Sequence, residues 1–227
     1  MMDAASLRHD LEIQGFHRLP ALLDPSRCAE LIKLYEDQHR FRKKVIMARH
    51  GYGSGEYQYF DYPLPRPVKS LRTRLYPALA RVANEWGKQL GTKSDFPEKH
   101  SDYIESCAAA GQVKPTPLIL KYTSGDFNRL HQDVYGEHLF PLQLTILLSR
   151  PGKEFTGGEF ILTEQRPRMQ SRARVVSLKQ GDAVIFPVRF RPGKGVRGFH
   201  RLNMRHGVSD LHSGHRFALG IIFHDAA

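Results

Sequence analysis

Apolar side chains recur at helical spacing through the first 112 residues, so we expect mainly helices there. Ser6 to Ile13 is a short amphipathic stretch, and Asp24-Pro25 is a typical cap and first turn of a second helix. A longer helix is predicted from Arg66 to Leu90, and another from Pro97 to Gly111. The apolar stripe of the longest helix predicts these core residues: Leu71, Leu75, Leu79, Val82, Ala83 and Trp86.

From Pro115 onward the apolar positions alternate with a period of two, which indicates strands. Even-numbered positions from Leu142 to Leu148 are apolar, and Val175 to Leu178 and Ala183 to Phe186 are further candidates. In the last predicted strand, one face carries Arg216, Ala218, Gly220 and Ile222, and the other carries Phe217, Leu219, Ile221 and Phe223. Short strands with Gly and Pro turns predict an α+β protein whose jelly-roll barrel (115–227) rests on a helical support region (1–114).

The segment from Phe41 to Tyr62 differs from the helices on either side of it. Basic residues precede a glycine-rich stretch, and Tyr57 and Tyr59 follow. Glycines give mobility and aromatic rings give stacking surfaces, so residues 41–62 could be a lid over a flat substrate such as a base. A glycine-turned hairpin whose aromatic side chains pack inward fits the pattern equally well.

Composition indicates a folded protein of one domain with a basic surface. Of the 227 residues, 41% are hydrophobic and 25% are charged, and the formal net charge is +11. This charge favours a polyanionic partner, of which nucleic acid is the commonest. With no apolar signal core and no apolar run of membrane length, we expect a cytoplasmic protein. Cys28 and Cys107 are then expected to be reduced buried thiols, and the absence of Cys-x-x-Cys excludes a zinc ribbon or an iron–sulfur site.

Three residues form a candidate metal site. His131 and Asp133 are two residues apart, so on an extended chain both side chains point to the same side. His206 could complete the set, and two histidines with one carboxylate are the ligands of non-haem Fe(II) oxygenases. Arg216, ten residues after His206, could hold the distal carboxylate of a 2-oxo acid bound to the iron.

The order of these residues resembles the prolyl-4-hydroxylase-like branch of the Fe(II)/2-oxoglutarate dioxygenases. Tyr122-x-x-Gly125 precedes His131-x-Asp133 as it does in that branch. Further similar segments are Thr156-Gly-Gly-Glu-Phe160, Gly181-Asp-Ala-Val-Ile-Phe186, Arg205-His-Gly-Val208 and His215-Arg-Phe-Ala-Leu219. The resemblance covers about Pro115 to His224 and implies a double-stranded β-helix that uses Fe(II), 2-oxoglutarate and O₂. It assigns iron to His131, Asp133 and His206.

The chain is also similar to a bacterial subgroup of this superfamily that is predicted to modify nucleic acids. The matching stretch runs from Thr145 to Gly152, through an arginine-rich segment, to Arg205-His-Gly-Val-Ser209. The resemblance implies a nucleic acid as the partner, with the co-substrate held by Arg216 and contacted by Tyr122 and Thr145.

An acid-free cationic run leads directly into His206. Its candidate phosphate contacts are Arg189, Arg191, Lys194, Arg197 and Arg201. Because the run is also rich in glycine and contains phenylalanines, it is typical of a phosphate-contacting loop, although a solvated loop has the same composition. With the two tyrosines of 41–62, these residues are the predicted nucleic-acid contacts.

We therefore expect an Fe(II)/2-oxoglutarate-dependent dioxygenase that hydroxylates or oxidatively demethylates a nucleic-acid base. The first alternative is a protein hydroxylase acting on a peptide, which is the activity of the branch that matches best, and a basic cleft could receive an acidic peptide. The second alternative is a non-enzymatic binding module on the same barrel. The sequence does not distinguish DNA from RNA.

Overall fold

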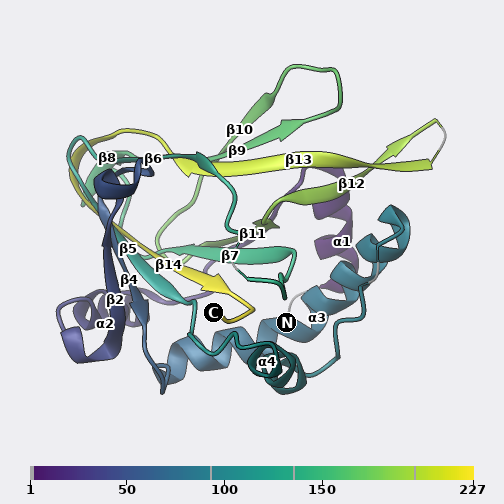
Figure 1. The fold of residues 1–227 in the computed structure, drawn as a ribbon. Helices are drawn as coiled ribbons and strands as arrows, with labels where there is room; N and C mark the ends of the chain where they lie inside the picture. The colour runs from purple at the N-terminus through teal and green to yellow at the C-terminus, as the bar shows by residue number, and fades with distance from the viewer. Residues whose placement is uncertain (1–2, 93, 135, 197) are drawn as a thin grey trace.

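Two antiparallel sheets face each other in the computed structural model, which describes residues 3–92, 94–134, 136–196 and 198–227 (Figure 1). The larger sheet has the order β1-β11-β7-β14-β5-β4-β2, and β8 pairs with β14 beside it. Its strands are β1 (His17–Leu19), β2 (Phe41–Ile46), β4 (Glu56–Phe60), β5 (Leu118–Thr123), β7 (Leu142–Leu147), β8 (Phe155–Gly157), β11 (Ala183–Pro187) and β14 (Leu211–Ile222).

The smaller sheet has the order β10-β9-β13-β6-β3, with β12 also paired to β13. Its strands are β3 (Gly53–Ser54), β6 (Phe127–His131), β9 (Phe160–Gln165), β10 (Arg172–Val176), β12 (Phe190–Gly195) and β13 (Gly198–Val208). In Figure 1 β13 crosses the upper part of the molecule, the β9–β10 hairpin rises above it, and the β12–β13 hairpin extends to the right. Two sheets enclosing an apolar interior confirm the predicted jelly-roll architecture.

The period-two alternation places two separate cores on the two faces of the larger sheet. Leu142, Leu144 and Ile146 of β7 pack with the helices, as do Leu219 and Ile221 of β14. The residues between them face the other way, into the space between the sheets, as predicted. Each central strand is therefore buried on both faces, with different chemistry on each.

Four α-helices cover the outer face of the larger sheet: α1 (Ala4–Ile13), α2 (Pro25–Leu34), α3 (Arg66–Leu90) and α4 (His100–Ala109). α3 has the predicted bounds, and its predicted core residues are all buried. Asp24 caps α2 by accepting a hydrogen bond from the Arg27 N–H, with Pro25 in the first turn. Short 3₁₀ turns, η1 (Gln38–Arg40) and η2 (Met47–His50), flank β2.

One sequence-based prediction about local structure is confirmed and one is corrected. The first 112 residues are mainly helical, as predicted, although the short strands β1, β2, β3 and β4 also arise there and join the sheets. The run from Arg189 to Arg205 is a β-hairpin (β12 and β13) and not a loop. Its side chains alternate, with Leu202 and Met204 buried and Arg201 and Arg205 exposed, and the many cations concealed this period of two.

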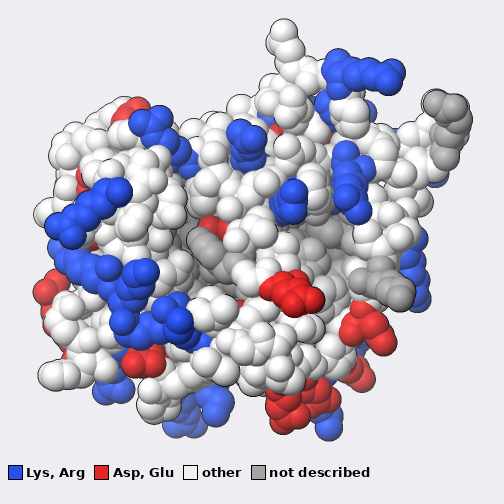
Figure 2. All heavy atoms as spheres, viewed as in Figure 1, with Lys and Arg blue, Asp and Glu red and all other residues white. Residues whose placement is uncertain are grey.

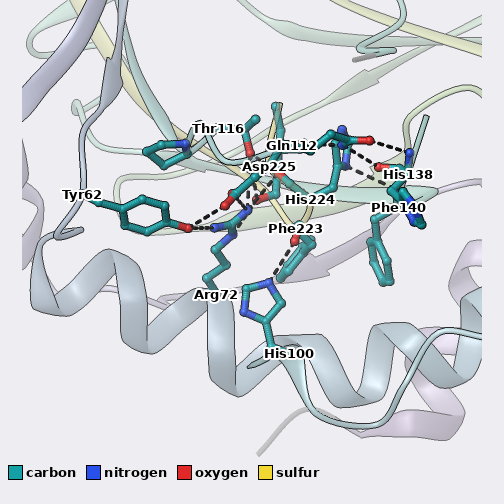
Figure 3. A network of polar contacts seen from close by, with 12 residues as sticks. Tyr62, Arg72, His100, Gln112, Thr116, His138, Phe140, Phe223, His224 and Asp225 are labelled. Atoms are coloured by element: carbon teal, nitrogen blue, oxygen red, sulfur yellow. Dashed lines mark hydrogen bonds and ion pairs between the residues drawn. The ribbon is translucent and has the colours of Figure 1, made fainter. Parts of the chain in front are cut away.

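A buried polar network joins α3 to the end of β14 (Figure 3). Arg72, only 2% exposed, donates to Asp225 at 2.7 Å and to the carbonyls of Ile222 and His224 at 2.9 Å. Tyr62 donates to the second Asp225 oxygen at 2.8 Å. The charge of Arg72 is thus fully compensated, as a buried ion requires.

The two cysteines are free and buried, as predicted. Burial raises the pKa of the Cys28 thiol to about 11, so this side chain acts as a small apolar core residue. Across the described ranges, no helix combines the length and the apolar character needed to cross a membrane.

Candidate metal centre and co-substrate pocket

The structure brings the three predicted metal ligands together between the two sheets. His131 ends β6 and lies directly opposite His206 of β13, and Asp133 follows two residues later. The Nε2 atoms of His131 and His206 lie 3.4 Å and 3.3 Å from the two Asp133 oxygens. Ligands about 2.1 Å from one ion and at right angles to each other lie about 3 Å apart. The three side chains therefore fit one face of a metal coordination sphere.

The ionised carboxylate of Asp133 favours a cation at this site. Burial alone would raise the pKa of Asp133, but the hydrogen bonds from His131 and His206 outweigh it and hold that pKa well below its usual range. His131 Nδ1 lies 2.7 Å from the Arg129 carbonyl, to which it can donate. This bond orients the ring and leaves Nε2 available for a metal, as in many metal-ligating histidines.

His206 is held by packing. Its ring lies 4.8 Å from the Phe186 ring and 4.2 Å from that of His131, between centroids. Burial lowers the pKa of His206 and so favours the neutral imidazole that binds metals. Gln143 Nε2 lies 3.3 Å from His206 Nε2, so the amide borders the ligand atom.

One cavity of about 280 Å³ contains the three predicted metal ligands and the predicted co-substrate residues. Its wall includes Arg216, Ala218, Gly220 and Ile222, the face of β14 that the alternation predicted. Other lining residues include Tyr52, Leu118, Leu120, Asn128, Val134, Gln143, Leu144, Phe160 and Val208. Small side chains on β14 leave room beside Arg216 for a ligand.

Arg216 is a buried cation that forms no ion pair with any described residue. It is 2% exposed, its Nε has no hydrogen-bond partner, and no carboxylate of a described residue forms an ion pair with it. Its guanidinium carbon lies 5.5 Å from the Tyr122 ring centroid and 6.0 Å from that of Phe155. Gly158, at φ +65°, makes the space, because a Cβ there would lie 3.0 Å from Arg216 Cδ. Such a charge fits an anionic ligand in the cavity.

Tyr122 and Thr145, the other predicted co-substrate contacts, both line this cavity. Tyr122 is fully buried, and burial raises the pKa of its hydroxyl to about 12, so it is a neutral donor. Asn128 Nδ2 lies 3.4 Å from that hydroxyl. Gln143, Asn128 and Tyr52 border the site without having been predicted, since isolated amides and tyrosines carry no motif.

The 41–62 segment is the hairpin of the second interpretation. β2 and β4 pair along their lengths, and β4 pairs with β5. Tyr57 and Tyr59 are 9% and 8% exposed and line the cavity from within, with their rings edge to face at 5.3 Å. Tyr57 and Tyr59 are therefore part of the cavity wall, and they could contact a substrate only where it enters the cavity.

The predicted phosphate contacts have different environments. Arg189, Lys194 and Arg201 are exposed, and Arg197 lies outside the described residues. Arg191 contradicts the prediction, because it is 3% exposed, pairs with Glu164 and donates to the Glu12 carbonyl at 2.7 Å. This arginine holds β12 to β9 and α1 and does not face solvent.

Gln132, between two predicted ligands, was missed as a functional residue. Its Nε2 lies 2.6 Å from Asn203 Oδ1, 2.8 Å from the Met204 carbonyl and 3.2 Å from the Arg189 carbonyl. The side chain therefore ties the ligand-bearing turn to the basic β12–β13 hairpin. Its place in the His-x-Asp motif was the available signal, but its acceptors are distant in sequence.

Comparison with known proteins gives a consistent result for most of the chain. Residues 55–226 match the Oxygenase-NA family, described as "Oxygenase, catalysing oxidative methylation of damaged DNA". The uncharacterized proteins MT2286 and Rv2227, from two strains of Mycobacterium tuberculosis, are each 48% identical over 168 residues. These alignments cover 74% of this chain and 72% of each relative.

Solved structures share the fold at low sequence identity. A Pseudomonas putida prolyl-4-hydroxylase has a TM-score of 0.57 at 15% identity, with 96% of each chain covered. A Burkholderia pseudomallei oxidoreductase of the 2OG-Fe(II) oxygenase family has a TM-score of 0.53 at 18% identity, covering 100% of this chain and 94% of that one. The expected double-stranded β-helix is thereby confirmed.

Proposed function

Because this chain belongs to the Oxygenase-NA family, we propose that it is an oxygenase that hydroxylates, or oxidatively demethylates, a base in a nucleic acid. Its fold is that of the Fe(II)/2-oxoglutarate oxygenases, and Fe(II), 2-oxoglutarate and O₂ are its cofactors. The observation that carries the proposal is the unpaired, buried Arg216 in one cavity with His131, Asp133 and His206.

Each side chain has a distinct role in this scheme. His131, Asp133 and His206 hold the metal by two nitrogens and a carboxylate. Arg216 binds the distal carboxylate of 2-oxoglutarate, and Tyr122 and Thr145 donate hydrogen bonds to it. When bound, the cofactors supply the oxidation, which converts a C–H bond into C–OH while 2-oxoglutarate and O₂ become succinate and CO₂. The apolar wall keeps competing water away from the reacting carbon.

The family description and the surface charge support nucleic acid as the substrate. Figure 2 shows Lys and Arg gathered over the β2–β4 hairpin and over the β9–β10 and β12–β13 hairpins, with a hollow between the two groups. Exposed cations in these segments are Lys43, Lys44, Arg49, Arg172, Arg189, Lys194 and Arg201. Cations on both sides of an opening fit a polyanion lying across it.

The test is turnover of 2-oxoglutarate to succinate by the Fe(II)-loaded protein. We expect it to rise when single-stranded DNA or RNA with methylated bases is added, with a gain of oxygen or loss of a methyl group in the oligonucleotide by mass spectrometry. Acidic and proline-containing peptides form the second arm. Stimulation and oxygen gain only in the peptide arm would overturn the nucleic-acid proposal and support a protein hydroxylase.

Ligand variants give the matched control. His131→Ala with Asp133→Ala should abolish Fe(II) binding, measured by calorimetry, and succinate formation. Lys153→Ala changes an exposed residue outside the cavity and should leave both unchanged. Succinate formation by the double variant would show that the ligand assignment is wrong, and metal-dependent binding without any turnover in the wild type would favour a binding module.

A further inference from the structure

An exposed aromatic pair lies at the opening of the cavity, on the turn between η2 and β3. The rings of His50 and Tyr52 are stacked, with centroids 5.3 Å apart and planes at 23°. Tyr52 is 50% exposed and also lines the cavity, whereas the neighbouring Tyr57 and Tyr59 are buried inside it. A large aromatic side chain that stays half exposed beside a cavity has a free face for a ligand.

The backbone holds this pair in a fixed position. The Tyr52 N–H donates to the Met47 carbonyl at 3.2 Å, and its own carbonyl accepts from the Arg129 N–H at 2.8 Å. Gly53, at φ +135°, lies so close to β6 that a Cβ would be 2.4 Å from the Phe127 carbonyl oxygen. Tyr52 is therefore attached to the strand that ends in the ligand His131, and little ordering entropy is lost when something stacks on it.

The chemistry around the pair selects the kind of partner. Arg49 precedes it in η2, Arg129 is bonded to it through the backbone, and both side chains are exposed. Aromatic faces next to cations match a ligand that alternates flat rings with negative charges. Val134, which is 44% exposed, lines the same cavity as Tyr52 and adds apolar surface there.

We propose that the stacked His50–Tyr52 pair is a base-stacking platform, on which an unpaired base of the substrate strand stacks as the strand crosses the cavity opening. This rests on the proposed function, because it assumes a nucleic-acid substrate. The strand's phosphates lie along the exposed cations, and the platform positions the base beside the metal site. Stacking is tolerant of sequence, so the platform supports affinity for single strands rather than for one base.

The experiment is a cycle of two protein forms and two ligands, measured as equilibrium binding at low salt without cofactors. Tyr52→Ala should bind a single-stranded oligonucleotide roughly 5- to 150-fold more weakly than the wild type, the usual range for losing one stacked base. An otherwise identical strand of abasic sites should show much less difference between the two forms, because it keeps the phosphates and lacks the rings. Tyr52→Phe keeps the ring and should bind like the wild type.

Fluorescence gives a second readout that separates stacking from a structural effect. Tyr52→Trp should show emission that is quenched by the intact strand and not by the abasic strand, above the signal of the buried Trp86. Val113→Trp, at a position 56% exposed and next to α4, is the control and should not be quenched.

Equal affinities of Tyr52→Ala and the wild type, with salt-dependent binding in both, would overturn the platform and leave the proposed function standing. The same loss of affinity on the intact and the abasic strand would also overturn it. No binding by the wild type would overturn the nucleic-acid substrate itself, and with it the platform.

Discussion

The two faces of the larger sheet each bury an arginine, and the two arginines differ in one respect. Arg72, on the helix side, is 2% exposed and is compensated by Asp225, two carbonyls and the Tyr62 hydroxyl. Arg216, on the barrel side, is equally buried and has no such anion among the described residues. Burial of a charge is costly in both places, but among the described residues only Arg72 has a hydrogen-bonded carboxylate that offsets this cost. An uncompensated buried charge thus distinguishes a ligand site from a structural one.

The largest expected effect on stability comes from removing the anion that compensates Arg72. Asp225→Asn leaves Arg72 buried without its anion and should lower the free energy of unfolding by about 3–5 kcal/mol. Arg216→Met should leave the stability of the ligand-free protein unchanged or raise it, because it removes a buried charge that forms no ion pair with a described residue. Urea unfolding measures both variants. A similar loss in both would mean that Arg216 is compensated by the chain itself.

Acid should weaken the helix side through two histidines next to Arg72. Burial, and secondly the charge of Arg72, lowers the pKa of His100 and that of His224 to about 4. Both pKa values lie below that of an unfolded histidine, so their contribution is present above about pH 6.5 and is lost as the pH falls toward 4. When the pH has fallen to about 4, the free energy of unfolding should be lower by on the order of 2–3 kcal/mol per histidine.

His100→Gln tests this cause, because glutamine does not titrate and can still donate to the Phe223 carbonyl, 2.9 Å from His100 Nε2. Unfolding free energies between pH 4 and 7 should fall less steeply in the variant. Parallel curves for the variant and the wild type would exclude His100 as a cause of the acid sensitivity and would point to protonation of carboxylates instead.

A smaller effect concerns the ligand on the barrel side. Arg216→Ala should weaken 2-oxoglutarate binding by about 1.5–3 kcal/mol, the loss of one charge-assisted pair, while Fe(II) binding is retained. Arg216→Lys should retain part of the affinity, since lysine keeps the positive charge but cannot form the two parallel hydrogen bonds that a guanidinium makes to a carboxylate. Calorimetric titration with the co-substrate measures both, and unchanged affinity in the alanine variant would contradict this role.

The smallest expected effect lies on the outer surface. If Arg201 contacts a phosphate, Arg201→Ala should flatten the slope of log affinity against log salt by about 0.7 for a single strand. Arg8→Ala removes the same charge from an exposed pair with Glu85 on the helices and should leave the slope unchanged. An equal change in both variants would indicate a general effect of net charge and no contact by Arg201.

His131, Asp133, His206 and Arg216 could be predicted to meet in one site because their spacing along strands is local information. The face of β14 with Arg216, Ala218 and Gly220 followed from its period of two. Contacts between residues distant in the chain were not predictable. Arg191 donates to Glu164 and is therefore buried, and Gln132 donates to Asn203 and to the Met204 carbonyl. β1 has three residues, too few to show a period. The hairpin that contains β2 was one of two interpretations of residues 41–62, because the exposed Lys43 and Lys44, which are typical of an edge strand, fit a mobile basic lid as well.

The N-terminal strands have a consequence for aggregation. β1 and β2 are the outermost strands of the larger sheet, and both precede residue 55, where the family match begins. A fragment of residues 55–226 would expose β11 at one end and β4 at the other, each with a row of unpaired N–H and C=O groups. Such edges pair readily with other chains. Residues before 55 therefore cover both ends of the sheet in the matched region, and we expect fragments for expression to aggregate less when they retain them.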